Sequence, residues 1–229
     1  KRVIQLGENP DRVYNVGTPG LDNIYNLDLL SKADFEKSID FTLGKRNILI
    51  TFHPVTLEVS TARKQFQELL NAVDELADTH IIFTKPNADT DGRIIIEMID
   101  DYVAKHPTKS CAFTSLGQLR YLSALQYMDA MVGNSSSGLM EAPSFKIATI
   151  NIGDRQKGRI KSTSVIDCLP NQSSITAAFQ KAFSKAFAET LKTAVNAYGA
   201  GGASLKIKEI IKTADLTGIL KKKFYDINQ

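Results

Sequence analysis

The sequence is poor in the residues that build metal centres and disulfide frameworks. Its 229 residues include no tryptophan, two cysteines and three histidines. Cys111 and Cys168 both lie in apolar, strand-like runs, so we expect buried thiols in a reducing compartment; a disulfide or a shared metal is the alternative. Because cysteine and histidine form no cluster, a zinc site is not expected.

Long apolar runs and blocks of like charge are also missing. No stretch approaches the roughly 20 apolar residues of a membrane span, and no signal peptide is visible, so we expect a cytoplasmic protein without a membrane partner. The 28 basic and 25 acidic residues nearly balance. No basic run contains interleaved aromatics, which argues against nucleic acid as a partner. The chain opens with Lys1 rather than methionine, so we expect a piece of a longer protein.

From about residue 32, helical and strand-like patterns alternate. Continuous apolar runs predict strands over residues 47–52, 80–84, 110–114, 131–132, 148–152 and 164–168. Helical spacing predicts helices over residues 32–44, 61–77, 92–105, 118–128 and 173–192. The last helix carries Ile175, Phe179, Phe183 and Phe187 at four-residue intervals, which is typical of core packing. Strict alternation with continuous apolar strands indicates an α/β fold, a Rossmann-like parallel sheet with helices on both faces.

The two ends of the chain have a different organisation. Within residues 1–30 the pattern predicts the end of a helix before Gly7, a strand over residues 13–16 and a helix over residues 21–29. These elements have no sheet of their own, so we expect the remnant of a second, N-terminal domain and its linker. Residues 31–198 are predicted to form the nucleotide-binding domain. Residues 199–229 begin with a glycine-rich break and predict two amphipathic helices that pack on the missing domain.

The run over residues 133–138 contains three successive serines between two glycines. It follows a predicted buried strand and precedes a predicted helix with Glu141 in its first turn. Backbone N–H groups and hydroxyls at such a junction can hold a phosphate, with the positive end of the helix dipole behind them. The alternative is an ordinary turn with a serine cap. Three serines exceed what a cap requires, so we favour phosphate binding by Ser135, Ser136 and Ser137.

Polar side chains also follow the other predicted strands, and ligands of doubly wound sheets bind at that edge. His53 directly follows the strand over residues 47–52 and can bind phosphate or exchange a proton near neutral pH; a structural histidine is the alternative. Arg155 and Arg159 flank the turn after residues 148–152, where a guanidinium can grip a diphosphate; the alternative is a solvated basic turn. Glu141 can bind a ribose diol or complete a capping box. Asn87 can contact a base or sugar, or cap a turn.

Taken together, the runs over residues 16–22, 52–56, 133–138, 141–145 and 150–159 resemble the hydrolysing UDP-N-acetylglucosamine 2-epimerases. The resemblance covers essentially the whole chain. It implies the C-terminal half of a two-domain fold of the GT-B type, with the active site between the domains. Members of this family eliminate UDP from UDP-N-acetylglucosamine and hydrate the glycal to N-acetylmannosamine, which feeds sialic acid synthesis. Close relatives use a diacetamido-bacillosamine nucleotide. The scheme requires no metal or redox cofactor, and the family is commonly a homodimer.

The resemblance also assigns roles to single residues. It implies diphosphate binding by Ser135, Ser136 and Arg155, and ribose binding by Glu141. His53 matches a histidine close to the phosphates and the scissile bond, and we take it as the catalytic candidate of this chain.

The uridine is expected beside Asn87 and the backbone at Leu116, while Ser137 and Arg159 are added from their chemistry alone. The acidic residues that move protons belong to the family's first domain, most of which is absent here. We therefore expect this chain to bind UDP and to be nearly inactive by itself. Two alternatives are a nucleotide-binding module that never catalyses and a UDP-sugar glycosyltransferase of the same fold.

Overall fold

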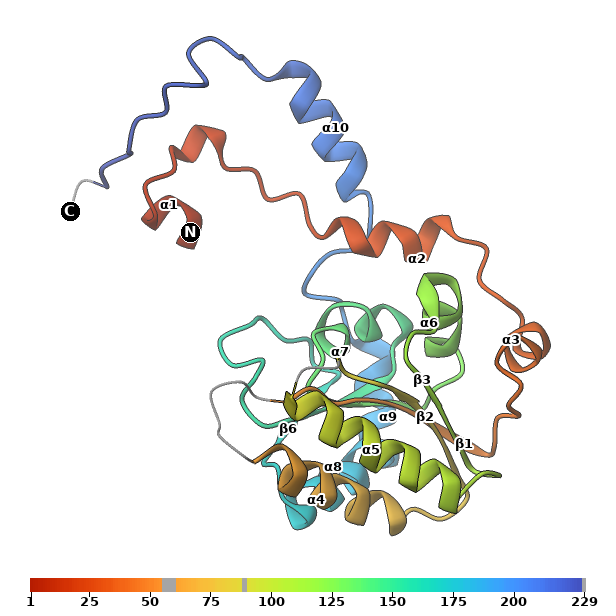
Figure 1. The fold of residues 1–229 in the computed structure, drawn as a ribbon. Coiled ribbons are helices and arrows are strands. Elements are labelled where there is room, and N and C mark those ends of the chain that lie inside the picture. Colours follow the sequence, from red (N-terminus) through yellow and green to blue (C-terminus); the bar gives the residue numbers. More distant parts are fainter. Residues whose placement is uncertain (55–60, 88–89, 228–229) are drawn as a thin grey trace. The chain divides into compact units, whose positions relative to one another are not determined.

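Figure 1 shows a computed structural model of the protein, which describes residues 1–54, 61–87 and 90–227. By its internal contacts the chain divides into two units. The larger unit comprises residues 27–198, and the smaller comprises residues 1–26 together with 199–229. None of the described helices is long and apolar enough to cross a membrane.

The larger unit is built on a six-stranded sheet with strand order β3-β2-β1-β4-β5-β6, and every neighbouring pair is parallel. The strands are β1 (Arg46–Thr51), β2 (Thr79–Thr84), β3 (Ser110–Phe113), β4 (Ala130–Gly133), β5 (Ala148–Ile152) and β6 (Val165–Cys168). A Rossmann-like parallel sheet was predicted from the alternation of apolar patterns, and it is confirmed.

Helices cover both faces of this sheet (Figure 1). On one face α4 (Ala62–Asp74) contacts both α5 (Thr90–Lys105) and α8 (Gln172–Ala182). On the other lie α6 (Gly117–Leu125) and α7 (Ser137–Met140), and α6 contacts α3 (Lys32–Ile39). Side chains alternate along a strand. Ile48 and Ile50 of β1 therefore join the core that contains Phe66 and Phe179, while the fully buried Leu49 faces the opposite side.

Two predicted helices have different bounds in the structure. The helix predicted over residues 32–44 ends at Ile39, because Asp40 adopts a left-handed conformation with φ of 50°. The helix predicted over residues 173–192 is two helices, α8 and α9 (Lys185–Thr193). Ser184 starts the second one, since its hydroxyl accepts a hydrogen bond from the Phe187 N–H at 3.2 Å. The N-cap was not predicted, because the phenylalanines keep their four-residue intervals on both sides of Ser184.

The smaller unit contains α1 (Arg2–Gln5), η1 (Pro10–Arg12), η2 (Pro19–Leu21), α2 (Asp22–Asn26) and α10 (Ala203–Thr213). Asp22 joins its two chain segments: the carboxylate accepts hydrogen bonds from the N–H groups of Ala203 at 3.0 Å and Ser204 at 2.7 Å, at the start of α10. Hydrogen bonding by the Ser204 side chain, and then by the backbone N–H groups, lowers the pKa of Asp22. Near the end of the described chain, the Tyr225 N–H donates to the Gly7 carbonyl at 2.9 Å.

Two predictions for the smaller unit are wrong. Residues 13–16 form no strand, because the described residues of this unit include no second strand to pair with them. Only one amphipathic helix, α10, follows the glycine-rich break, and residues 214–227 are not helical. The cysteines also differ from expectation, since both are half-buried rather than buried. Cys111 and Cys168 are free thiols on the opposite edge strands β3 and β6.

Candidate functional site

Parallel strands bring the segments after β1, β4 and β5 to the same edge of the sheet. β4 pairs with β1 on one side and with β5 on the other, so these three strand ends are neighbours. His53 follows β1, the serine run follows β4, and Arg155 follows β5. Ligands of open α/β sheets bind at this edge, where the strand order reverses direction. The structure therefore places the central residues of the predicted site together.

The turn at Gly133 brings β4 into close contact with the end of β1. Gly133 has a φ of 128°, and a Cβ at this position would lie 2.0 Å from the carbonyl oxygen of Thr51. Only glycine fits such an approach. The following residue, Asn134, is 1% exposed, and its N–H donates to the same Thr51 carbonyl at 3.2 Å.

The side chain of Asn134 binds the backbone of His53 through two hydrogen bonds. Its Oδ1 accepts from the His53 N–H at 2.7 Å, and its Nδ2 donates to the His53 carbonyl at 2.8 Å. His53 is followed by Pro54, whose ring restricts the conformation of the preceding residue. The backbone from which the half-buried imidazole projects is thus fixed from both sides.

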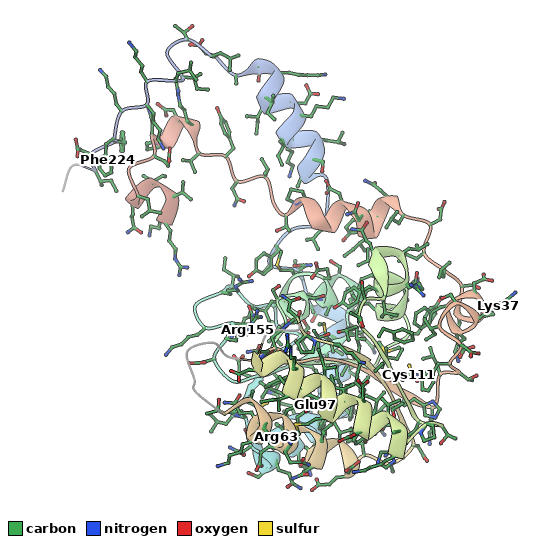
Figure 2. All side chains as sticks on the ribbon, viewed as in Figure 1. Lys37, Arg63, Glu97, Cys111, Arg155 and Phe224 are labelled. Carbon is green, nitrogen blue, oxygen red and sulfur yellow. The ribbon has the colours of Figure 1, made fainter. Side chains whose placement is uncertain are left out.

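The carbonyl of Asn134 accepts two further hydrogen bonds from the loop after β5. Arg155 donates through Nη1 at 3.0 Å, and the buried Gln156 donates through Nε2 at 2.7 Å. Figure 2 shows Arg155 on this loop. Asn134 therefore connects the segments that carry His53, the serines and Arg155.

Arg155 and Arg159 form a positively charged pair on the exposed loop after β5. Partial burial and the neighbouring charge of Arg159 lower the pKa of Arg155, although a guanidinium stays charged at neutral pH. In the described part of the chain, neither guanidinium is paired with a carboxylate. Two neighbouring cations without an acidic partner favour an anionic ligand.

The serine run leads into a short helix. All three serines are half-buried, and the Ser135 Oγ accepts a hydrogen bond from the Ser137 N–H at 3.4 Å. The helix α7 has four residues and passes directly into η3 (Ala142–Phe145). Pro143 lacks the N–H that a continuing α-helix would use. A single turn has a weak dipole, so any phosphate here relies on N–H groups, hydroxyls and Arg155.

Glu141 lies between α7 and η3, so the prediction that it occupies the first turn of a longer helix is wrong. Its Oε2 is inaccessible and has no hydrogen-bond partner among the described residues. Burial raises the pKa of Glu141, while the nearby Ser137 hydroxyl lowers it. That hydroxyl also accepts a hydrogen bond from Tyr121 at 2.6 Å. Ser137 is thus engaged on the side toward Glu141, which favours a supporting role over direct phosphate contact.

The residues predicted beside the uridine lie after β2 and β3. Asn87 is exposed in the segment after β2. Leu116 occupies the N-cap position of α6, and the residue is 3% exposed. Gly117 follows with a φ of 66° and open space where a Cβ would lie. These two segments belong to β2 and β3, on the side of β1 away from β5.

Sequence reasoning missed Asn134, Gln156 and Tyr121, which organise the site without being exposed candidates for ligand contact. Asn134 was included in the glycine-serine run but received no role of its own. Its partner His53 is 81 residues away, and no local pattern shows such a pairing. The buried Gln156 stands among exposed polar residues, and only the topology shows that it points inward.

Comparison with known proteins agrees with this geometry. The sequence model of the UDP-N-acetylglucosamine 2-epimerase family matches residues 1–212. The chain belongs to the UDP-N-acetylglucosamine 2-epimerase family. A GDP/UDP-N,N'-diacetylbacillosamine 2-epimerase (hydrolyzing) of Campylobacter jejuni is 42% identical over 99% of this chain and 59% of its own length. The polysialic acid biosynthesis protein P7 of Escherichia coli is 38% identical over 99% of this chain and 58% of its own length.

Among solved structures, the UDP-N-acetylglucosamine 2-epimerase of Neisseria meningitidis, bound to UDP-N-acetylglucosamine, has a TM-score of 0.74 at 15% identity. The match covers 93% of this chain and 58% of that structure. At this identity the likeness concerns the fold. The chain thus spans less than two thirds of the length of these 2-epimerase relatives.

Proposed function

We propose that this chain supplies the UDP-binding part of a hydrolysing 2-epimerase in the cytoplasm. The complete enzyme would eliminate UDP from UDP-N-acetylglucosamine and hydrate the resulting glycal to N-acetylmannosamine, as a step toward sialic acid. Residues 31–198 would be the nucleotide-binding domain, and residues 1–30 and 199–229 would belong with a second domain. We expect a homodimer of the complete protein.

The observation that carries this proposal is the hydrogen-bonded group around Asn134, which gathers His53, the serines and Arg155 at one edge of the sheet. In the proposed complex Ser135 and Ser136 donate to the diphosphate, and Arg155 binds it with the support of Arg159. A guanidinium suits this task because its planar fork can contact two phosphate oxygens. In that complex His53 would lie close to the same phosphates and would stabilise charge on the departing UDP.

Glu141 would accept hydrogen bonds from the ribose hydroxyls. Glu141 is half-buried beside the serine run, and a carboxylate can accept hydrogen bonds from both hydroxyls of a ribose diol, which supports this assignment. The uracil would then lie toward the segments after β2 and β3, near Asn87 and the backbone at Leu116. Ser137 would orient Glu141 from the protein side.

Proton transfer in the reaction would depend mainly on groups in the part of the relatives that this chain does not match. General acid–base groups contribute typically about 10²–10⁴ in rate each. We therefore expect these 229 residues to bind UDP and to release it from the sugar nucleotide at least about a hundredfold more slowly than the complete enzyme.

A second substrate is favoured by one observation, the 42% identity to a diacetylbacillosamine 2-epimerase. UDP-N,N'-diacetylbacillosamine has a second acetamido group in place of a sugar hydroxyl. The complete enzyme should be offered both sugar nucleotides, with UDP release and the free sugar followed by chromatography. Preference for the diacetamido sugar would replace N-acetylglucosamine in the proposal, and release of UDP from neither would remove the epimerase assignment.

UDP binding is tested first, by calorimetry on this chain. Replacement of Arg155 by alanine should weaken UDP binding, whereas replacement of the exposed Lys157 in the same loop should change it little. If both variants weakened binding equally, the effect would be a general loss of positive charge. If the unaltered chain bound no UDP, the proposed site would be wrong.

A further inference from the structure

We infer that Asn134 is a positioning residue that holds His53 and Arg155 in register with each other. The inference rests on the proposed function in one respect: both residues are taken to act on the same ligand. Asn134 itself is 1% exposed, so no ligand can contact its side chain. Its influence on binding would therefore pass entirely through the residues to which it is hydrogen-bonded.

The side chain of Asn134 is hydrogen-bonded to both backbone groups of His53, to the N–H at 2.7 Å and to the carbonyl at 2.8 Å. An amide that donates and accepts on one residue imitates a rung of a β-ladder, just beyond the point where β1 ends at Thr51. Without it, the backbone at His53 would lose these two hydrogen bonds at once. The imidazole would lose this part of its support.

The backbone of Asn134 positions Arg155. Its carbonyl accepts from Arg155 Nη1 at 3.0 Å and Gln156 Nε2 at 2.7 Å. One guanidinium nitrogen is thus held by the protein, which leaves the others to face outward from the exposed loop. The N–H of Asn134 is itself held by the Thr51 carbonyl at 3.2 Å, next to Gly133, where there is no room for a Cβ. One residue therefore fixes two groups that come from different loops.

The chain contains a matched control for this arrangement. Asn47, near the beginning of β1, makes the same pair of hydrogen bonds to one residue: its Oδ1 accepts from the Gly44 N–H at 2.8 Å, and its Nδ2 donates to the Gly44 carbonyl at 3.2 Å. Asn47 is also buried and lies opposite His80 on β2. Loss of either amide removes equivalent bonds, but at opposite ends of the strand.

The first experiment records the imidazole signals of the three histidines by nitrogen-15 NMR in the full chain without ligand, at one fixed pH. Asn134→Ala should move the signals of His53 and leave those of His80 unchanged. Asn47→Ala should do the reverse. Asn134→Asp provides a second variant of the same size that keeps the acceptor and loses the Nδ2 donor. The inference is overturned if His53 is unaffected by both Asn134 variants, or responds equally to Asn47→Ala.

The second experiment measures UDP affinity in two backgrounds. In the unaltered chain Asn134→Ala should weaken UDP binding by about tenfold, as expected when charged hydrogen-bonding groups lose their orientation. In a chain that already carries His53→Ala and Arg155→Ala, the same change should cost less than about twofold, because the two groups through which Asn134 acts are gone. Equal losses in both backgrounds would overturn the inference. If the unaltered chain bound no UDP, the proposed function would fail, while the imidazole comparison would still decide the role of Asn134.

Discussion

Replacement of Glu141 by glutamine is expected to stabilise the folded chain at neutral pH while it weakens UDP binding. The Oε2 of Glu141 is inaccessible and has no hydrogen-bond partner in the described part of the structure. A buried polar atom without a partner costs about 1–3 kcal/mol. Because Glu141 as a whole is only half-buried, we take the lower end, about 1 kcal/mol. A neutral amide of the same shape loses less on burial than a carboxylate.

The pH dependence of this effect has a definite sign. Burial raises the pKa of Glu141 in the folded chain above its ordinary value of 4.5. As the pH rises, the unfolded chain therefore loses this proton first, and folding becomes less favourable until the folded form has also lost it. Below the ordinary pKa both states carry a neutral carboxyl. The advantage of the glutamine variant should be small near pH 4 and full near pH 7.

Thermal unfolding measured at several pH values tests the reasoning. For a chain of this size, about 1 kcal/mol corresponds to a rise in Tm of roughly 2–4 °C. The matched control is Glu97→Gln on the exposed face of α5 (Figure 2), which should leave Tm unchanged. A lower Tm for Glu141→Gln at pH 7, or a difference from the unaltered chain that stays constant down to pH 4, would refute the account. UDP affinity should fall by about tenfold in the same variant.

Three further results are expected. Arg155→Lys should weaken UDP binding by about tenfold by calorimetry, because a lysine cannot keep one donor on the Asn134 carbonyl and present a planar fork to the ligand. Gly138→Ala should lower the free energy of unfolding in urea by about 1–3 kcal/mol, since its Cβ would lie 2.6 Å from Thr149 Cγ2; a smaller side chain at position 149 should restore part of the loss. Cys111 and Cys168 should resist alkylation at pH 8 by mass spectrometry, because burial raises the pKa of each thiol to about 12.

The sheet of the larger unit could be predicted because its signals are local. Each strand is a continuous apolar run, and each described strand differs from its predicted bounds by at most two residues. Parallel order follows from the alternation of strands with helices. Once the strands are parallel, the residues directly after them must share an edge. This is why His53, the serines and Arg155 could be grouped before any contact between them was known.

Predictions failed where a nonlocal contact or a cap overrode a regular pattern. Phe179, Phe183 and Phe187 keep a helical spacing through the point where Ser184 starts a new helix. Residues 13–16 have the composition of a strand, but a strand forms only beside another strand, and the smaller unit has none over residues 1–26 and 199–227. The prediction that Glu141 lies in the first turn of a helix failed, although Pro143 was visible in the sequence as a helix breaker.

Two asparagines bind the backbone at the two ends of β1, and they show why the organisation of the site could not be predicted. Asn47 and Asn134 each bind the N–H and the carbonyl of a single residue, at 2.8 and 3.2 Å for Asn47 and at 2.7 and 2.8 Å for Asn134. Asn47 reaches a residue three positions away, and this contact secures a loop at the amino end of the sheet. Asn134 reaches a residue 81 positions away, at the carboxyl end where ligands bind. Both side chains make the same kind of hydrogen bonds. Only Asn134 makes them at the end of the sheet where ligands bind, so its proposed role depends on its place in the fold and not on its chemistry.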